Sequence, residues 1–133
     1  MTTQTNQLIT GVDFAGVPTT DLEASVAFYG ETLGLRRSVY RPENGFAEFE
    51  TGNLTLSIYD PKQMGIGEHE RNPNPIALHV DDIETARSTF EERGVSFFGD
   101  TLDTGVCHMA FFADPDGNAF MLHSRYVTRT TES

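Results

Sequence analysis

Two histidines near the ends of predicted strands are the side chains best suited to chemistry in this sequence. His79 closes the segment IALH, and His123 closes the segment AFMLH. A neutral imidazole can hydrogen-bond a ligand carbonyl or hydroxyl, and it can transfer protons near neutral pH. Each could equally be a structural histidine at a strand end. We therefore treat His79 and His123 as candidate acid–base residues or ligand anchors.

The single cysteine does not extend this chemistry. Cys107 is followed directly by His108, but adjacent residues of a strand point to opposite faces, which argues against a cysteine–histidine nucleophile. One cysteine also excludes an internal disulfide, and no Cys/His spacing typical of zinc sites is present.

Alternation along the strands predicts which side chains share a surface with the histidines. Ile76, Leu78 and Val80 form an apolar face that should meet a helix, which turns His79 to the opposite side. Applied to four predicted strands, this pattern places six residues on a common ligand-binding surface: Phe14, Ser57, Tyr59, His79, Met121 and His123. Met121 would also serve as a core filler.

An internal repeat supplies the elements that must hold these residues. Residues 17–35 and 78–95 each read as the end of a strand followed by a helix, with capping-box patterns at Thr20/Glu23 and Asp81/Glu84. Each is followed by a predicted hairpin, 46–50 with 54–59 and 107–113 with 119–123. Turn chemistry accounts for all of DPDGN, residues 114–118, so we expect a turn there and nothing more.

The pattern β-α-β-β-β therefore occurs twice. We predict one domain over residues 1–133, with a first module at 11–60, a polar linker at 61–73 and a second module at 74–126. Seven apolar residues should be buried beneath the helices: Val17, Leu22, Leu78, Ile83, Phe90, Phe120 and Leu122.

The composition and charge of the chain limit the kinds of molecule that it is expected to bind. The formal net charge of −11 is spread along the chain, so nucleic acid and anionic membranes are poor partners. The N-terminal residues lack the basic and apolar regions of a signal peptide, and no apolar run reaches membrane-spanning length. We expect a cytoplasmic protein.

The duplication, together with DLEASVAFYGETLGL in the first half and FFADPDGN in the second, resembles the vicinal oxygen chelate superfamily. This superfamily includes glyoxalase I, extradiol dioxygenases, and fosfomycin- and bleomycin-resistance proteins. The resemblance covers residues 11–126 and implies an α+β fold in which two βαβββ modules form a cup-shaped half-barrel. It does not identify an activity, because the superfamily contains both metalloenzymes and non-catalytic drug binders.

The resemblance also implies where a metal would sit in the cup. The matching positions hold Phe14, Pro75 and Met121, together with Ser57 or Leu56, none of which is a suitable donor. We therefore expect no metal and no other cofactor. A one-residue slip of the first strand would turn Asp13 inward and could restore a ligand.

Two classes of function remain open. We favour a metal-free binding protein of the bleomycin-resistance type, which holds an apolar or aromatic small molecule in the cup. The alternative is a lyase, isomerase or dioxygenase of the same superfamily, with a non-standard metal site or acid–base chemistry at His79 and His123. Exposed strand edges and the family resemblance also predict a homodimer.

Overall fold

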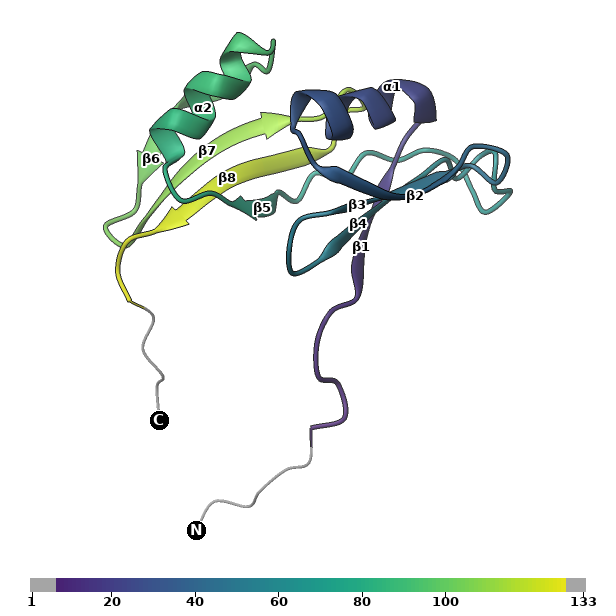
Figure 1. The fold of residues 1–133 in the computed structure, drawn as a ribbon, viewed down its shortest axis with the longest axis horizontal. Coiled ribbons are helices and arrows are strands. Elements are labelled where there is room, and N and C mark those ends of the chain that lie inside the picture. Colours follow the sequence, from purple (N-terminus) through teal and green to yellow (C-terminus); the bar gives the residue numbers. More distant parts are fainter. Residues whose placement is uncertain (1–6, 129–133) are drawn as a thin grey trace.

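The computed structural model describes residues 7–128 and contains two βαβββ modules (Figure 1). The elements of the first are β1 (Phe14–Pro18), α1 (Leu22–Ala27), a π-helical turn (Phe28–Thr32), β2 (Arg36–Arg41), β3 (Phe46–Glu50) and β4 (Thr55–Tyr59). Those of the second are β5 (Ile76–His79), α2 (Ile83–Glu92), β6 (Phe97–Asp103), β7 (Cys107–Ala113) and β8 (Ala119–Arg125). The predicted α+β fold is confirmed.

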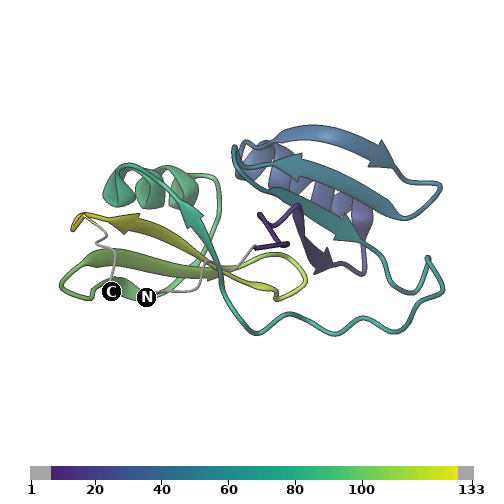
Figure 2. The same ribbon diagram turned by 90° about the horizontal axis from the view of Figure 1, so that it is seen from below.

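Each module folds into one four-stranded mixed sheet. The strand orders are β1-β4-β3-β2 and β5-β8-β7-β6, so the first strand of each module pairs in parallel with the last. The helices α1 and α2 lie on the same side of the molecule in Figure 1, and α1 lies behind the strands of its sheet in the view from below (Figure 2). Within residues 7–128, no helix covers the opposite face of either sheet.

The helix-facing sides of both sheets contribute to one apolar core. Five of the seven residues predicted beneath the helices are buried: Val17, Leu22, Ile83, Phe120 and Leu122. Leu78 and Phe90 are only partly buried, although both pack against this core. The reason is that these two side chains also line a pocket between the modules.

The predicted helix caps are each wrong by one residue. Asp21 caps α1 by accepting a hydrogen bond from the Ala24 N–H at 3.1 Å, and Asp82 caps α2 through the Thr85 N–H at 3.2 Å. Thr20 is not free to cap, because both its backbone N–H and its hydroxyl donate to Asp116.

The DPDGN segment does more than turn the chain, so that expectation is also wrong. It forms the predicted turn, with Gly117 at φ 84°, but its side chains reach into the first module. Asp116 accepts hydrogen bonds from the hydroxyls of Thr19 and Ser25 as well as from Thr20. Burial alone would raise the pKa of the Asp116 carboxyl, but the hydrogen bonds from Thr19 and Thr20 outweigh it and hold that pKa below its usual value.

The buried centre of this contact joins Asp114, Asn118 and Tyr29. The Tyr29 hydroxyl donates to Asp114 Oδ2 at 2.5 Å, and the Asn118 amide donates to the same oxygen at 2.8 Å and to the Pro18 carbonyl at 2.7 Å. Burial and the nearby Asp114 carboxylate raise the pKa of the Tyr29 phenol. The Tyr29 ring also packs against Phe49 of its own module and Phe120 of the other. We call residues 114–118 with Thr19, Thr20, Ser25 and Tyr29 the polar joint.

The polar joint should contribute measurably to stability. Tyr29→Phe removes a buried hydroxyl and leaves Asp114 short of one donor, so the free energy of unfolding should fall by about 1 to 3 kcal/mol. Tyr126→Phe is the matched control, because its hydroxyl also donates to a carboxylate, Asp103, but at an exposed site. Urea unfolding should show a clear loss for the first variant and almost none for the second. Equal effects would mean that the joint contributes no more than a surface contact.

Candidate functional site

The six predicted ligand-binding residues fall into two groups on two different sheets. Phe14, Ser57 and Tyr59 belong to the first sheet, where Ser57 pairs with Gly16 and Tyr59 with Pro18. Ser57 and Tyr59 alternate with the buried Leu56 and Ile58, so they lie on the face away from α1. Phe14 is largely exposed, at 59%.

The second group contains both candidate catalytic residues. His79 and His123 are direct partners in the parallel pairing of β5 and β8, and Ala77 pairs with Met121 two residues earlier in each strand. The predicted neighbourhood of the two imidazoles is therefore present on one sheet face. His79 Nε2 lies 3.0 Å from Asp81 Oδ1 at an exposed position, whereas His123 is half-buried. Among the hydrogen bonds of residues 7–128, none links these residues to Phe14, Ser57 or Tyr59.

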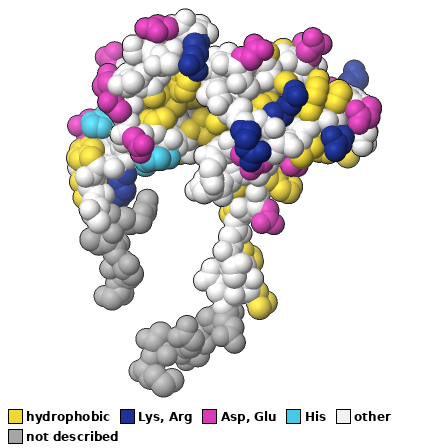
Figure 3. All heavy atoms as spheres, in the orientation of Figure 1, with side chains coloured by type: hydrophobic (Ala, Val, Ile, Leu, Met, Phe, Trp, Pro, Cys, Tyr) yellow, Lys and Arg dark blue, Asp and Glu magenta, His cyan; other side chains and the backbone are white. Residues whose placement is uncertain are grey.

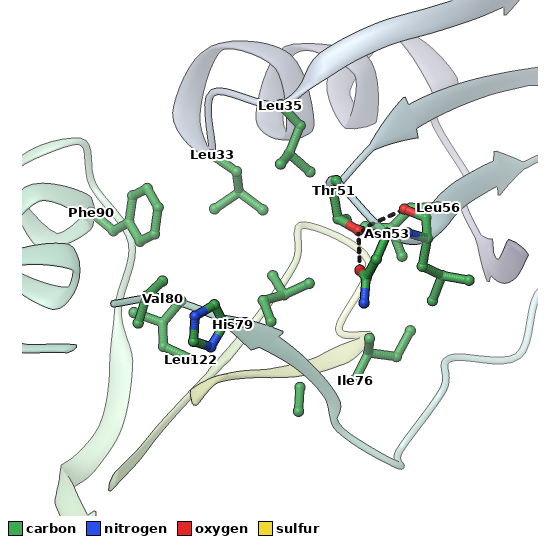
Figure 4. A pocket seen from close by; sticks show the side chains of 14 residues that line it. Leu33, Leu35, Thr51, Asn53, Leu56, Ile76, His79, Val80, Phe90 and Leu122 are labelled. Carbon is green, nitrogen blue, oxygen red and sulfur yellow. Dashed lines mark hydrogen bonds between the residues drawn. The ribbon is translucent and has the colours of Figure 1, made fainter. Parts of the chain in front are cut away.

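A pocket lies between the modules and beside β5 (Figure 4). Its volume is about 630 Å³. It is lined by Leu33, Leu35, Thr51, Gly52, Asn53, Leu54, Leu56, Ile76, Ala77, Leu78, His79, Val80, Phe90 and Leu122. His79 is the one residue shared with the predicted set. In the space-filling view, hydrophobic side chains gather in the hollow between the two halves (Figure 3).

Three parts of the fold surround this pocket. Leu33 and Leu35 follow the π-helical turn, Phe90 comes from α2, and the β3–β4 turn at residues 51–54 closes a third side. In Figure 4, Leu33, Leu35 and Phe90 point into the same volume from different elements. Strand alternation predicted Ile76, Leu78 and Leu122 on one face, but it could not predict how two modules dock or where they leave a gap.

The lining is apolar, with few polar groups. Thr51 Oγ1 donates to the Leu54 carbonyl at 2.6 Å and also lies 3.4 Å from its second acceptor, Asn53 Oδ1. His79 is the third polar side chain of the wall. None of the described lining residues is Lys, Arg, Asp or Glu. Such a wall suits an uncharged, mainly apolar molecule, because a buried charge without a partner is strongly unfavourable.

The metal that the fold family implies does not fit the residues present. Phe14 and Met121 occupy two of the expected donor positions on the strand faces, and Ser57 lies on the same face as Phe14. Within the described part of the chain, no group of three or more His, Cys, Asp or Glu side chains could hold an ion. Asp13 is exposed just before β1 and joins no such group.

Cys107 and His108 diverge, as expected from strand alternation. Cys107 is buried, and its Sγ lies 3.1 Å from Thr104 Oγ1, whereas His108 Nε2 lies 3.5 Å from Asp103. Neither arrangement supports a cysteine–histidine nucleophile. None of the helices in residues 7–128 has the length and apolar character needed to cross a membrane.

The sequence and the fold were compared with those of known proteins. A family model described as the Glyoxalase/Bleomycin resistance protein/Dioxygenase superfamily matches residues 11–122. No curated protein matched the chain.

Three solved structures illustrate the structural similarity. A member of the same superfamily from Sphaerobacter thermophilus is 26% identical with a TM-score of 0.76, over 90% of this chain and 100% of the other. TnmS3, an antibiotic binding protein from a Streptomyces species, is 26% identical with a TM-score of 0.75, over 90% and 99%. A lactoylglutathione lyase from Agrobacterium tumefaciens is 19% identical with a TM-score of 0.73, over 87% and 94%, which shows a shared fold alone.

The donor set predicts the metal content of the purified protein. After expression with Fe, Mn, Ni and Zn supplied, elemental analysis should find far less than one equivalent of any of them, because too few donors converge. About one equivalent per chain, lost in both His79→Ala and His123→Ala, would contradict this prediction and establish a non-standard site.

Proposed function

Because this chain belongs to the glyoxalase/bleomycin resistance protein/dioxygenase superfamily, we propose that it is a metal-free small-molecule binding protein. Its ligand is apolar or aromatic and lies between the two modules. The observation that carries this proposal is the inter-module pocket, with its apolar wall and volume of about 630 Å³. Pockets for small organic ligands have this size and character.

The comparison with TnmS3 supports the same class of function. That protein is named as an antibiotic binding protein, and the two chains align along almost their whole lengths at 26% identity. An antibiotic-like organic molecule is therefore a reasonable ligand class for this chain.

The other five residues predicted to contact the ligand lie outside the pocket. Phe14, Ser57, Tyr59, Met121 and His123 lie on sheet faces rather than in the pocket wall. They would contact a ligand only if it bound on the helix-free side of the sheets. One substitution in the pocket wall and one on the helix-free face of the second sheet distinguish these locations.

One observation supports a second candidate function. The register pairs His79 with His123, so two histidines occupy neighbouring positions on one sheet face, and a histidine is suited to acid–base catalysis by a lyase or isomerase. Turnover of a bound ligand that His123→Ala abolishes while leaving ligand affinity unchanged would establish this alternative.

Substitutions along the pocket should identify where the ligand binds. A thermal-shift screen of uncharged aromatic compounds supplies the probe, and titration then gives its affinity for each variant. Leu54→Gln places an amide in the apolar wall and should weaken binding about five- to hundred-fold, because a polar group is then buried against the ligand.

Two variants complete that comparison. Met121→Gln tests the helix-free sheet face, and Ile66→Gln controls for a polar substitution at an exposed aliphatic residue outside the pocket. Weakening by Met121→Gln alone would move the ligand to the sheet face. No saturable binding by any uncharged compound would reject the proposed function.

We also propose that the chain forms a homodimer. Several large apolar side chains are exposed in the described residues, including Leu8, Ile9, Val12, Phe14, Phe98 and Leu102. Sedimentation at micromolar concentration should give about twice the 14.7 kDa mass of one chain. A single species of monomer mass would argue against the dimer.

A further inference from the structure

The pocket borders an unpaired edge of β5. In the sheet order β5-β8-β7-β6, this strand has a neighbour on one side, and within residues 7–128 no strand pairs with its other side. Five consecutive residues, 76–80, line the pocket. A strand that presents a face contributes alternate residues, whereas one that presents an edge contributes consecutive ones. The pocket therefore meets β5 along its edge.

The backbone groups at this edge can be assigned. The Val80 N–H donates to the His123 carbonyl on β8 at 3.0 Å. Because hydrogen bonding alternates along a parallel strand, Ile76 and Leu78 also direct their backbone groups toward β8. The N–H and C=O groups of Ala77 and His79 then point away from β8, toward the pocket.

The side chains beside these groups define the rest of the ligand. Leu78 and Phe90 provide apolar surface in the pocket wall. In Figure 4, Leu33 of the first module points into the same space as Phe90. With no charged residue among the described lining residues and a net charge of −11 on the chain, an acidic ligand is disfavoured.

Taking the pocket as the ligand site, as the proposed function does, we propose that its ligand is an extended, amide-containing molecule such as a short uncharged peptide. The amide groups of the ligand hydrogen-bond to the backbone of Ala77 and His79, as an added strand does at a sheet edge. An apolar substituent of the ligand fills the space between Leu33, Leu78 and Phe90. Backbone pairing supplies the orientation, and the pocket selects the substituent.

A proline substitution tests this pairing without breaking the sheet. Ala77→Pro removes the N–H that points away from β8 and retains the ladder bonds of Ile76 and Leu78, so it should fold, as prolines at strand edges do. Ala77→Val is the matched control, because it adds a side chain but keeps the N–H. Thermal unfolding of both variants verifies that they fold.

The probes are acetyl-valyl-leucyl-valinamide and the same tripeptide N-methylated at each residue in turn. Ala77→Pro should bind the parent tripeptide about tenfold more weakly than wild type. Ala77→Val should bind it more tightly than Ala77→Pro, because it keeps the N–H. Methylation of at least one amide should weaken binding to wild type by a similar factor. In hydrogen-exchange NMR, the tripeptide should slow exchange of the Ala77 and His79 amides.

Each remaining outcome overturns the inference in a recognisable way. If the uncharged, amide-free probe 1-naphthylmethanol binds and the tripeptide does not, the proposed function stands and the amide pairing is rejected. If neither binds, both fail. Equal affinity of wild type and Ala77→Pro for the tripeptide also rejects the amide pairing. So does protection of the Ala77 and His79 amides that rises with protein concentration in the absence of ligand, because a second copy of the chain would then pair with this edge.

Discussion

The arrangement of the two modules depends on the buried Asp114 carboxylate. Its Oδ2 accepts hydrogen bonds from the Tyr29 hydroxyl of the first module and the Asn118 amide of the second, while Asn118 also donates to the Pro18 carbonyl. A buried carboxylate is unfavourable without such donors, so the carboxylate and its partners require one another. Because the donors come from both modules, satisfying them fixes the docking of one sheet against the other, and the pocket is a consequence of that docking.

The contact between the two modules is packed at one end, at the polar joint, and open at the other, at the pocket. The turn between β7 and β8 reaches the start of α1, but the corresponding turn between β3 and β4 forms one wall of the pocket instead. At the open end, the Arg93 guanidinium donates to the Thr32 carbonyl at 3.0 Å. The same β-α-β-β-β pattern, used twice, therefore yields one packed contact and one cavity, because the two turns differ in sequence: DPDGN in one module and TGN in the other.

Periodicity and repetition predicted most of the fold, since both depend on local sequence. The alternation of Leu56 with Ser57, and of Leu122 with Met121 and His123, gave the correct sheet faces. The cap of α1 was misassigned because Thr20 and Asp21 are both good capping residues, and a contact 96 residues away decides between them. The pocket was missed for a related reason: it lies along a strand edge between docked modules, whereas alternation describes faces within one sheet. The metal-donor positions followed from the family resemblance alone, and in the structure Phe14 opens β1 and Met121 lies within β8.

The distance in sequence between the partners of the polar joint has a consequence for synthesis. Thr19, Ser25 and Tyr29 bond to carboxylates that lie 85 to 97 residues later in the chain. At a ribosomal rate of about 5 to 20 residues per second, these three side chains of the first module wait roughly 5 to 20 seconds for Asp114 and Asp116 to appear. During that interval its hydroxyls and the Tyr29 ring have no second module to pack against. The nascent first half is thus an incomplete folding unit, and the last turn to emerge is the one that completes it.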